Sequence, residues 1–212
     1  ILPPNLVKIG VSAFEKQPIG TIILTPKISN IGVKAFQKCS SLTTVDFNKT
    51  KTEMKISEEG FSSTAIKTLD FPENITSIGI RAFQNCIGLN KITFNNNNLI
   101  DSGLAFEGCI NLSEITFNDY EITNMPNKNI QIFKNCTAIK QVSINCKEKQ
   151  SIYEIKKKII SILPTSIIKN ITFTNSECLT TTTTTTAKPT TTTTTTAKPT
   201  TTTTTTAKPT TT

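Results

Sequence analysis

The chain has no histidine and no tryptophan among its 212 residues. Without an imidazole it cannot assemble the Ser-His-Asp or Cys-His groupings of hydrolases, and no zinc site can include a histidine ligand. Its six cysteines contain no C-x-x-C pair, so a cysteine metal site is not expected either. We therefore expect no catalysis and no metal or other cofactor within these residues.

Long apolar runs and dense basic clusters are also missing. No segment approaches the roughly 20 apolar residues that cross a bilayer. Three of the 23 lysines and arginines lie in the threonine-rich C-terminal stretch, which leaves 20 basic against 15 acidic residues elsewhere. Apart from Lys156-Lys157-Lys158 the basic residues are scattered. Nucleic-acid binding normally shows a denser basic stripe, so we do not expect it here.

The two ends of the chain carry little information about targeting. It begins with Ile1 rather than methionine, Ile1-Leu2-Pro3-Pro4 resembles the end of an earlier repeat's strand, and the last residue lies inside a threonine run. We expect both ends to be cut, so the lack of a signal peptide or membrane-spanning segment is uninformative. Membrane attachment is expected only through sequence outside this chain, and the oligomeric state is left open.

One apolar pattern is repeated six times. Its clearest copy runs from Ala35-Phe36 through Cys39 and Leu42 to Val45 and Phe47. The marker phenylalanines, spaced by 22, 25, 22, 23 and 27 residues, are Phe14, Phe36, Phe61, Phe83, Phe106 and Phe133. A period in the twenties with L-x-x-I-x-F spacing predicts a leucine-rich-repeat solenoid.

Each repeat can be interpreted as one coil of that solenoid. The I-x-F pair alternates as a short strand does, so stacked copies predict a parallel sheet on the concave face, with the leucine-type residues buried. Pairs such as Ile31-Gly32 indicate a tight bend, where a left-handed or crowded backbone excludes a Cβ. The predicted fold class is therefore a β-rich leucine-rich-repeat solenoid of the α/β type, occupying residues 1–179.

The last unit, residues 147–179, departs from the pattern. Ser151-Ile152-Tyr153-Glu154 forms a capping box, and apolar residues follow at helical spacing until Pro164. Ile168, Ile171 and Phe173 then supply one more L-x-x-I-x-F strand. A longer helix followed by a last strand predicts a C-terminal cap. The alternative is a basic amphipathic helix that contacts a membrane surface.

The combination of I-G-x-x-A-F-x-x-C with L-x-x-I-x-F closely resembles the BspA-like (Treponema-type) leucine-rich repeats, over residues 1–173. The best copies begin at Ile31-Gly32 and Ile78-Gly79, and the pattern lapses at Gln17 and Thr64, where cysteine is absent, and at Gly60 and Ile132, where alanine is replaced. The resemblance implies a surface-exposed or secreted protein of bacteria or parasitic protists, from a family implicated in adhesion. It implies no enzymatic residues.

The cysteines fall into two groups. Four occupy the same repeat position and are interpreted as small buried core residues, although a bridge between neighbouring repeats is compatible with the spacing; they are Cys39, Cys86, Cys109 and Cys136. Cys146 and Cys178 each lie just beyond one of the last two strands. We predict a disulfide between these two that closes the cap and fits an extracellular compartment.

The C-terminal stretch, residues 180–212, repeats seven threonines followed by Ala-Lys-Pro. It has no apolar side to bury, so we expect it to be disordered, and its composition is typical of a mucin-like, O-glycosylated stalk. An unmodified flexible linker is the alternative, and both are spacers. Of the five N-x-S/T sequons, Asn48 and Asn74 are the two at which we expect N-glycosylation.

The candidate ligand-binding residues are the outward positions of the predicted strands. They are small and polar, without the aromatic anchors of tight interfaces, and comprise Thr44, Asp46, Thr68, Asp70, Lys91, Thr93, Glu114, Thr116, Gln141 and Ser143. The alternative is a solvated face without a partner. The leading hypothesis is an extracellular or cell-surface adhesin module that binds protein or glycan; a structural coat component and a non-catalytic module of a larger secreted enzyme are the other two.

Overall fold

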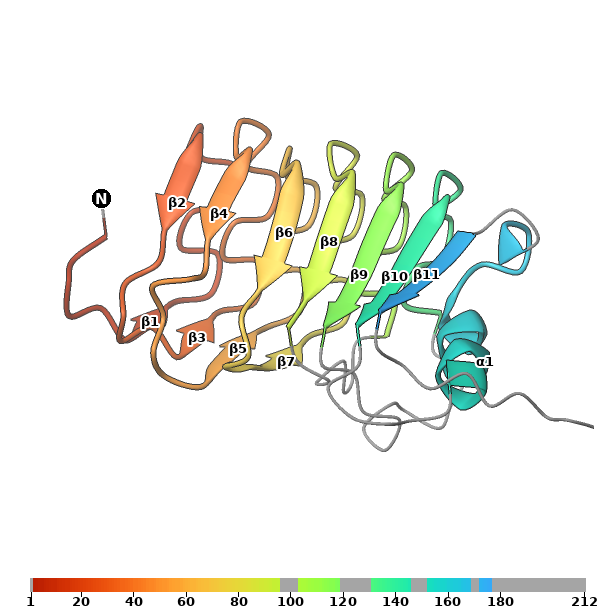
Figure 1. Cartoon of the computed structure of the whole chain (residues 1–212). Helices are drawn as coiled ribbons and strands as arrows, with labels where there is room; N and C mark the ends of the chain where they lie inside the picture. Colours follow the sequence, from red (N-terminus) through yellow and green to blue (C-terminus); the bar gives the residue numbers. More distant parts are fainter. Residues whose placement is uncertain (1, 96–102, 119–130, 146–151, 169–171, 177–212) are drawn as a thin grey trace, which may run out of the picture. The chain divides into compact units, whose positions relative to one another are not determined.

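The computed structural model describes residues 2–95, 103–118, 131–145, 152–168 and 172–176. Within these residues every paired strand runs parallel to its neighbour, and successive coils lie side by side (Figure 1). The largest sheet has five strands, ordered β6-β8-β9-β10-β11. Their bounds are β6 (Thr68–Phe71), β8 (Lys91–Phe94), β9 (Glu114–Asn118), β10 (Gln141–Asn145) and β11 (Thr172–Ser176). The predicted solenoid with a parallel sheet is confirmed.

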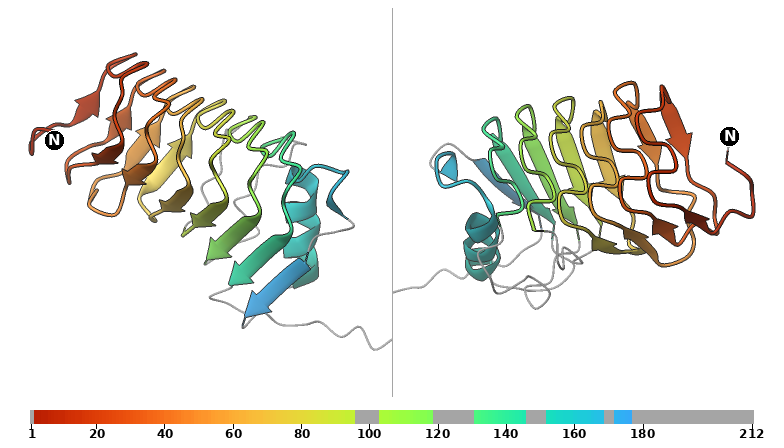
Figure 2. Two further views of the ribbon diagram at one scale, coloured as in Figure 1. Left: turned by 90° about the horizontal axis from the view of Figure 1, so that it is seen from above. Right: turned by 180° about the vertical axis from the view of Figure 1, so that it is seen from behind.

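The predicted sheet is divided in two. The first two I-x-F strands form a separate pair, β2 (Thr21–Ile23) and β4 (Thr44–Asp46). A second, unpredicted sheet occupies another side of the coil (Figure 2), and it consists of β1 (Lys8–Ile9), β3 (Asn30–Ile31), β5 (Met54–Ile56) and β7 (Ile75–Ile78). The chain therefore makes two strands per coil up to β7, and the segments that follow β8, β9 and β10 lie outside the described residues.

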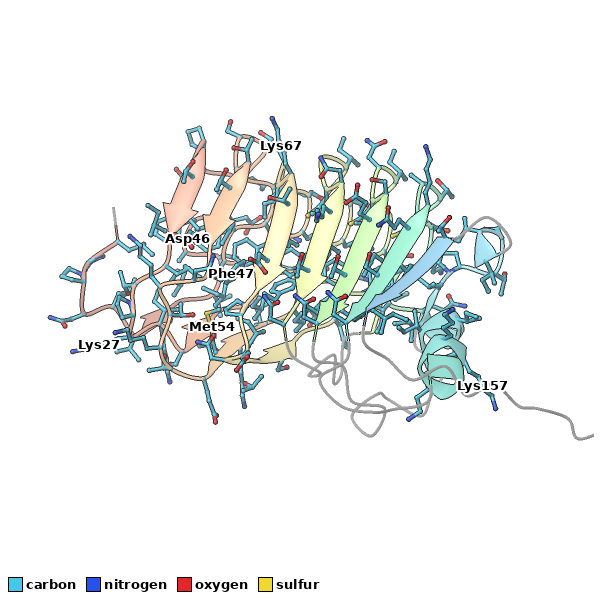
Figure 3. The ribbon with its side chains drawn as sticks, in the orientation of Figure 1. Lys27, Asp46, Phe47, Met54, Lys67 and Lys157 are labelled. Atoms are coloured by element: carbon cyan, nitrogen blue, oxygen red, sulfur yellow. The ribbon has the colours of Figure 1, made fainter. Side chains whose placement is uncertain are left out.

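The interior is filled by apolar residues that occupy the same position in successive coils. All six marker phenylalanines stack face to face on their neighbours, with centroids 5.0–5.4 Å apart. Phe71, Phe94 and Phe117 form a second stack behind the five-stranded sheet, at 5.4 and 5.3 Å. Figure 3 shows the difference between inside and outside: Phe47 and Met54 are fully buried, whereas Lys67 is exposed. No single coil could bury these rings alone, so stability comes from stacking.

Of the two causes predicted for the glycines at the bends, a left-handed backbone or a crowded one, the structure shows crowding. A Cβ on Gly32 would lie 2.6 Å from the backbone carbon of Gly10, and one on Gly79 would lie 2.7 Å from the Glu58 nitrogen. Crowding between coils therefore requires these glycines, and their own φ angles are not left-handed. The left-handed positions are instead mostly polar residues, such as Lys38 (φ 60°) and Asn85 (φ 56°), and short polar side chains such as Asn tolerate that region best.

The predicted C-terminal cap is present. α1 (Ile152–Ile162) follows β10, and β11 pairs with β10 in register from Gln141↔Thr172 to Asn145↔Ser176. Ile159 and Ile162 of the helix are buried in the same apolar cluster as the last repeat. These residues face the protein interior, which favours the cap over a helix that lies on a membrane.

Candidate binding surface

The predicted ligand residues lie on the outward face of the strands, where side chains alternate with buried ones. On the five-stranded sheet they form two rows across the strands. Register places Thr68, Lys91, Glu114 and Gln141 opposite one another, and likewise Asp70, Thr93, Thr116 and Ser143. Thr44 and Asp46 lie on the separate β2–β4 pair. The structure therefore brings eight of the ten predicted residues onto one sheet, because that sheet does not extend to β4.

The two rows differ in exposure and in contacts. The first row is exposed throughout, and Lys91 pairs with Glu114 across the strands at 3.3 Å. In the second row Asp70 is exposed, whereas Thr93, Thr116 and Ser143 are half-buried. Both charges of the ion pair are about half exposed, so water screens it and it contributes little to stability. These two rows offer hydroxyls, one amide and a few charges, and no aromatic ring.

A third row on this face was missed by the sequence reasoning. It is a ladder of side-chain hydrogen bonds at the downstream ends of the strands, which we call the amide ladder. Asn145 Nδ2 donates to Asn118 Oδ1 (2.6 Å), Asn118 Nδ2 to Asn95 Oδ1 (2.6 Å), and Asn95 Nδ2 to Asp70 Oδ1 (2.7 Å). All the amides point the same way along the solenoid, and the chain ends on a carboxylate, an arrangement in which each bond polarises the next. An asparagine directly after the last apolar residue of the motif in β8, β9 and β10 was the signal.

The repeat cysteines are confirmed as buried core residues, and all four are free thiols. Each also donates a hydrogen bond to the carbonyl oxygen of the preceding coil's marker phenylalanine or its equivalent: Cys39 to Phe14, Cys86 to Phe61, Cys109 to Phe83 and Cys136 to Phe106, at 2.9–3.3 Å. Where Thr64 replaces cysteine, its hydroxyl bonds to the Phe61 carbonyl of its own coil (2.9 Å).

Burial suppresses ionisation of these thiols. It raises the pKa of Cys86 to about 11, although hydrogen bonds from Thr64 oppose the shift. The pKa of Cys109 is raised by a hydrogen bond with Cys136 and by burial, and that of Cys39 by burial. Because the thiolate is the reactive form, these cysteines are poor nucleophiles and poor metal ligands at neutral pH. Among the described residues, no group of three or more Cys, Asp or Glu side chains could hold a metal ion.

The predicted modification sites differ in their surroundings. Asn48 is exposed, and the Thr50 hydroxyl of its sequon is buried and donates to the Phe47 carbonyl (2.7 Å). Asn74 Nδ2 donates to Thr50 Oγ1 (3.0 Å) and to the Thr52 carbonyl (2.7 Å), so a glycan on this nitrogen would compete with both bonds. N-glycosylation at the two sites stays a prediction. Cys146, Cys178 and residues 180–212 lie outside the described residues.

The coil geometry and the rows on the sheet define a leucine-rich-repeat solenoid. The chain belongs to the BspA-type leucine-rich-repeat family, since the description "BspA type Leucine rich repeat region (6 copies)" matches residues 1–55 and 54–186. No curated protein sequence matches it. No helix in the described part of the chain is long and apolar enough to cross a membrane.

Three solved structures are similar to the chain. The crystal structure of the pneumococcal vaccine antigen PcpA has a TM-score of 0.63 and 17% identity, covering 82% of this chain and 40% of that one. A leucine-rich repeat protein from Bacteroides ovatus is 19% identical (TM-score 0.34; 68% and 56% covered), and a leucine rich cell surface protein from Faecalibacterium prausnitzii is 14% identical (TM-score 0.25; 81% and 70% covered). The chain thus spans about two fifths of the length of PcpA, and that likeness shows the fold.

Proposed function

We propose that this solenoid is an adhesin-type binding module, displayed outside the cell, that contacts protein or glycan partners through the outward face of its five-stranded sheet. The observation that carries the proposal is the in-register order of that face. Two rows of polar side chains and the amide ladder run across successive strands without a buried or apolar interruption. Family membership supports a repeat-based binding module.

The chemistry of the face favours repeated weak contacts. Strands in a sheet lie about 4.8 Å apart, so each row presents a donor or acceptor at that interval. Each such contact is weak in water because it replaces a bond to solvent. A partner with its own regular hydrogen-bonding groups, such as an extended protein segment or a glycan chain, would engage several rows at once and gain avidity from the repetition.

The remaining parts of the chain fit the same role. We propose that residues 180–212 form an O-glycosylated, mucin-like stalk that holds the solenoid away from its point of attachment. A Cys146–Cys178 disulfide and N-glycans at Asn48 and Asn74 belong to the same extracellular proposal. Of the two asparagines, Asn48 is the better candidate, because its side chain is exposed while that of Asn74 bonds to Thr50 and Thr52.

Plate-binding and glycan-array measurements on the full chain test the proposal. The face variant carries Thr68→Arg, Glu114→Arg and Gln141→Arg, three exposed positions in the first row. The control variant carries Ser40→Arg, Glu58→Arg and Thr137→Arg, which are exposed, lie away from the sheet and change the net charge by the same amount. Both variants should retain the circular dichroism spectrum and melting temperature of the parent.

The expected result is binding to at least one matrix protein, host cell or glycan, lowered about tenfold or more in the face variant and kept in the control. Two results would overturn the proposal: no binding above a scrambled-surface control, or equal loss in both variants. Concentration-dependent self-association without any heterologous ligand would instead favour the coat component.

A further inference from the structure

The second sheet presents a polar row of its own on its outward side. Register places next to one another four residues, one from each strand: Lys8, Asn30, Lys55 and Ser77. In each strand the isoleucine that follows is buried, so the row faces outward. Two lysines therefore alternate with two neutral polar side chains. Because neighbouring strands lie about 4.8 Å apart, the backbones of the two lysines are about 10 Å apart.

Two more lysines border this row, at the bends that precede β3 and β5. The N–H of Lys51 donates to the Pro26 carbonyl (3.1 Å), which places Lys51 beside Lys27 on neighbouring coils. Lys27 points away from the ribbon (Figure 3), and its Nζ donates to Asn5 Oδ1 (2.9 Å). These lysines are scattered in the sequence but lie on three consecutive coils. We call the group the lysine patch, and it consists of Lys8, Lys27, Lys51 and Lys55.

The positive charge of the lysine patch is not neutralised. All four lysines are exposed, and none of them forms an ion pair with a carboxylate of the described residues. Glu53 on the same coils and Glu73 on the next one leave positive charge in excess. The two rows on the five-stranded sheet differ, since they carry Lys91 against the carboxylates of Asp70 and Glu114. The patch is therefore the sheet surface that attracts an anion.

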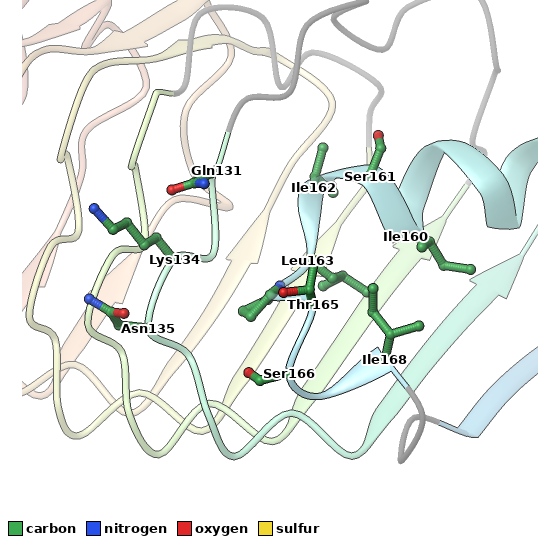
Figure 4. Close-up of a pocket in the computed structure, with 11 residues that line it drawn as sticks. Gln131, Lys134, Asn135, Ile160, Ser161, Ile162, Leu163, Thr165, Ser166 and Ile168 are labelled. Carbon is green, nitrogen blue, oxygen red and sulfur yellow. The ribbon is translucent and has the colours of Figure 1, made fainter.

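The cavity beside the last repeat is not a second site of this kind. It has a volume of about 530 Å³ and lies between the last repeat and the segment that follows α1 (Figure 4). Of the described residues that line it, only Lys134 is charged, and Lys134 is paired with Glu107 at 3.6 Å. An anion in the cavity would compete with that carboxylate, whereas an anion at the lysine patch has no such competitor.

We propose that the lysine patch binds an acidic polysaccharide, a linear chain whose sugars carry carboxylate or sulfate groups at intervals. Lysine binds each anionic group as a point charge with three donors. Between the two lysines of the row, Asn30 makes no side-chain hydrogen bond to the described residues, so its amide can donate to one sugar hydroxyl and accept from another. The alternation of charged and neutral polar groups in the row matches that of the polysaccharide.

Other polyanions fit this surface less well. Proteins that bind single-stranded nucleic acids stack the bases on aromatic rings. Binding to an anionic membrane gains strength from apolar side chains that enter the lipid. The row on the second sheet offers neither an aromatic ring nor an apolar side chain. It offers hydrogen-bonding groups between charges, which a polysaccharide can use.

Binding of the full chain to immobilised polysaccharides tests the proposal. Hyaluronate and chondroitin sulfate are the acidic probes, and dextran is the neutral one. The patch variant carries Lys8→Gln, Lys27→Gln, Lys51→Gln and Lys55→Gln. The control variant has the same net charge and replaces four exposed lysines that lie away from the second sheet: Lys16→Gln, Lys38→Gln, Lys134→Gln and Lys157→Gln. Both should keep the circular dichroism spectrum and melting temperature of the parent, because all eight side chains are exposed.

We expect the parent to bind at least one acidic probe and not dextran. Binding should be about tenfold or more weaker in the patch variant and nearly unchanged in the control. Added salt should weaken binding by the parent, because it screens exposed charges. Glu53→Gln removes the carboxylate beside Lys55 and should bind the acidic probe more tightly than the parent.

Four results would overturn the site: no binding to either acidic probe, equal binding to dextran, equal loss in the patch and control variants, or tighter binding to single-stranded DNA or phosphatidylserine vesicles than to the polysaccharides. Equal loss would mean that net charge alone attracts the probe. The face variant of the five-stranded sheet should keep binding to the acidic probes. Failure of the adhesin proposal and failure of this one are therefore distinguishable, and loss in the face variant but not in the patch variant would place the polysaccharide on the other sheet.

Discussion

Two ladders run along the solenoid, one of phenylalanine rings inside it and one of amide side chains outside it. Both arise from the same cause: parallel coils in register place identical positions next to one another. The marker rings lie 5.0–5.4 Å apart and all but Phe14 are completely buried. The amide ladder has tighter individual contacts, at 2.6–2.7 Å, but its members remain partly open to water.

The two ladders are expected to contribute unequally to the stability of the fold. Burying a phenylalanine removes a large apolar area from water, and each ring pair adds about 0.5–1.5 kcal/mol beyond that burial. A hydrogen bond on the surface replaces one to water and contributes only about 0.5–1.5 kcal/mol net. We therefore expect the inner ladder to determine stability, while the outer face is free to serve binding.

Truncation in the middle of the inner ladder should have the largest effect. Phe83 stacks on Phe61 and Phe106, each at 5.3 Å, and touches Phe71 edge-on. Phe83→Ala leaves a cavity between two rings that cannot close, so we expect a loss of about 3–5 kcal/mol in the free energy of unfolding, measured by urea titration. Phe14→Ala is the matched control, because Phe14 is only half-buried and stacks on one ring. Equal costs at the two positions would contradict the ladder.

The buried thiols should make stability depend on alkaline pH, with a smaller effect. The pKa of Cys86 rises from 9.0 to about 11 on folding, so between these values the unfolded chain releases a proton that the folded chain keeps. The thiol's contribution to the free energy of unfolding is therefore fully present below pH 9. Between pH 9 and 11 the free energy of unfolding falls by about 1.4 kcal/mol per pH unit for one such thiol. Urea titrations at pH 8, 9, 10 and 11 measure the slope.

Cys86→Ala should flatten that slope, although it also removes the bond to the Phe61 carbonyl and so lowers stability at every pH. The Asn118 side chain is an amide, which does not ionise, so an Asn118 variant should keep the slope of the parent. An unchanged slope in Cys86→Ala would show that other groups cause the alkaline loss.

The phenylalanine ladder could be predicted from the sequence because its buried positions must be apolar, and they therefore recur at a regular spacing. Phe36, Phe83 and Phe106 stand in the same frame as Ala and Cys neighbours, and their period fixes the coil. The cap followed from the capping box at Ser151 and from Pro164. In each case apolar residues recur at one spacing, because a polar residue buried at these positions would destabilise the fold.

The second sheet and the amide ladder could not be predicted in the same way. β1 and β3 have two residues each, with one buried isoleucine, which is too short for any alternation to show. The amide ladder forms only where side chains of four different coils meet. In the sequence, Asn95 alone is indistinguishable from a turn residue. The break in the sheet between β4 and β6 could not be predicted either, because Thr44 and Thr68 occupy the same position of the repeat motif.

Removing a member of the amide ladder should have the smallest effect on stability. Asn118→Ala removes one donor and one acceptor, leaving Asn95 Oδ1 and Asn145 Nδ2 without that partner. Water can reach these half-buried groups, so we expect a loss of about 1 kcal/mol in urea titrations. Thr116→Ala is the control: it lies on the same strand and face, is half-buried, and makes no side-chain hydrogen bond to the described residues. A loss of unfolding free energy as large as that of Phe83→Ala would show that the amide ladder stabilises the fold as much as the phenylalanine ladder does. A cost no larger than that of Thr116→Ala would show that its bonds merely replace those to water, and that the asparagines are free to bind a partner.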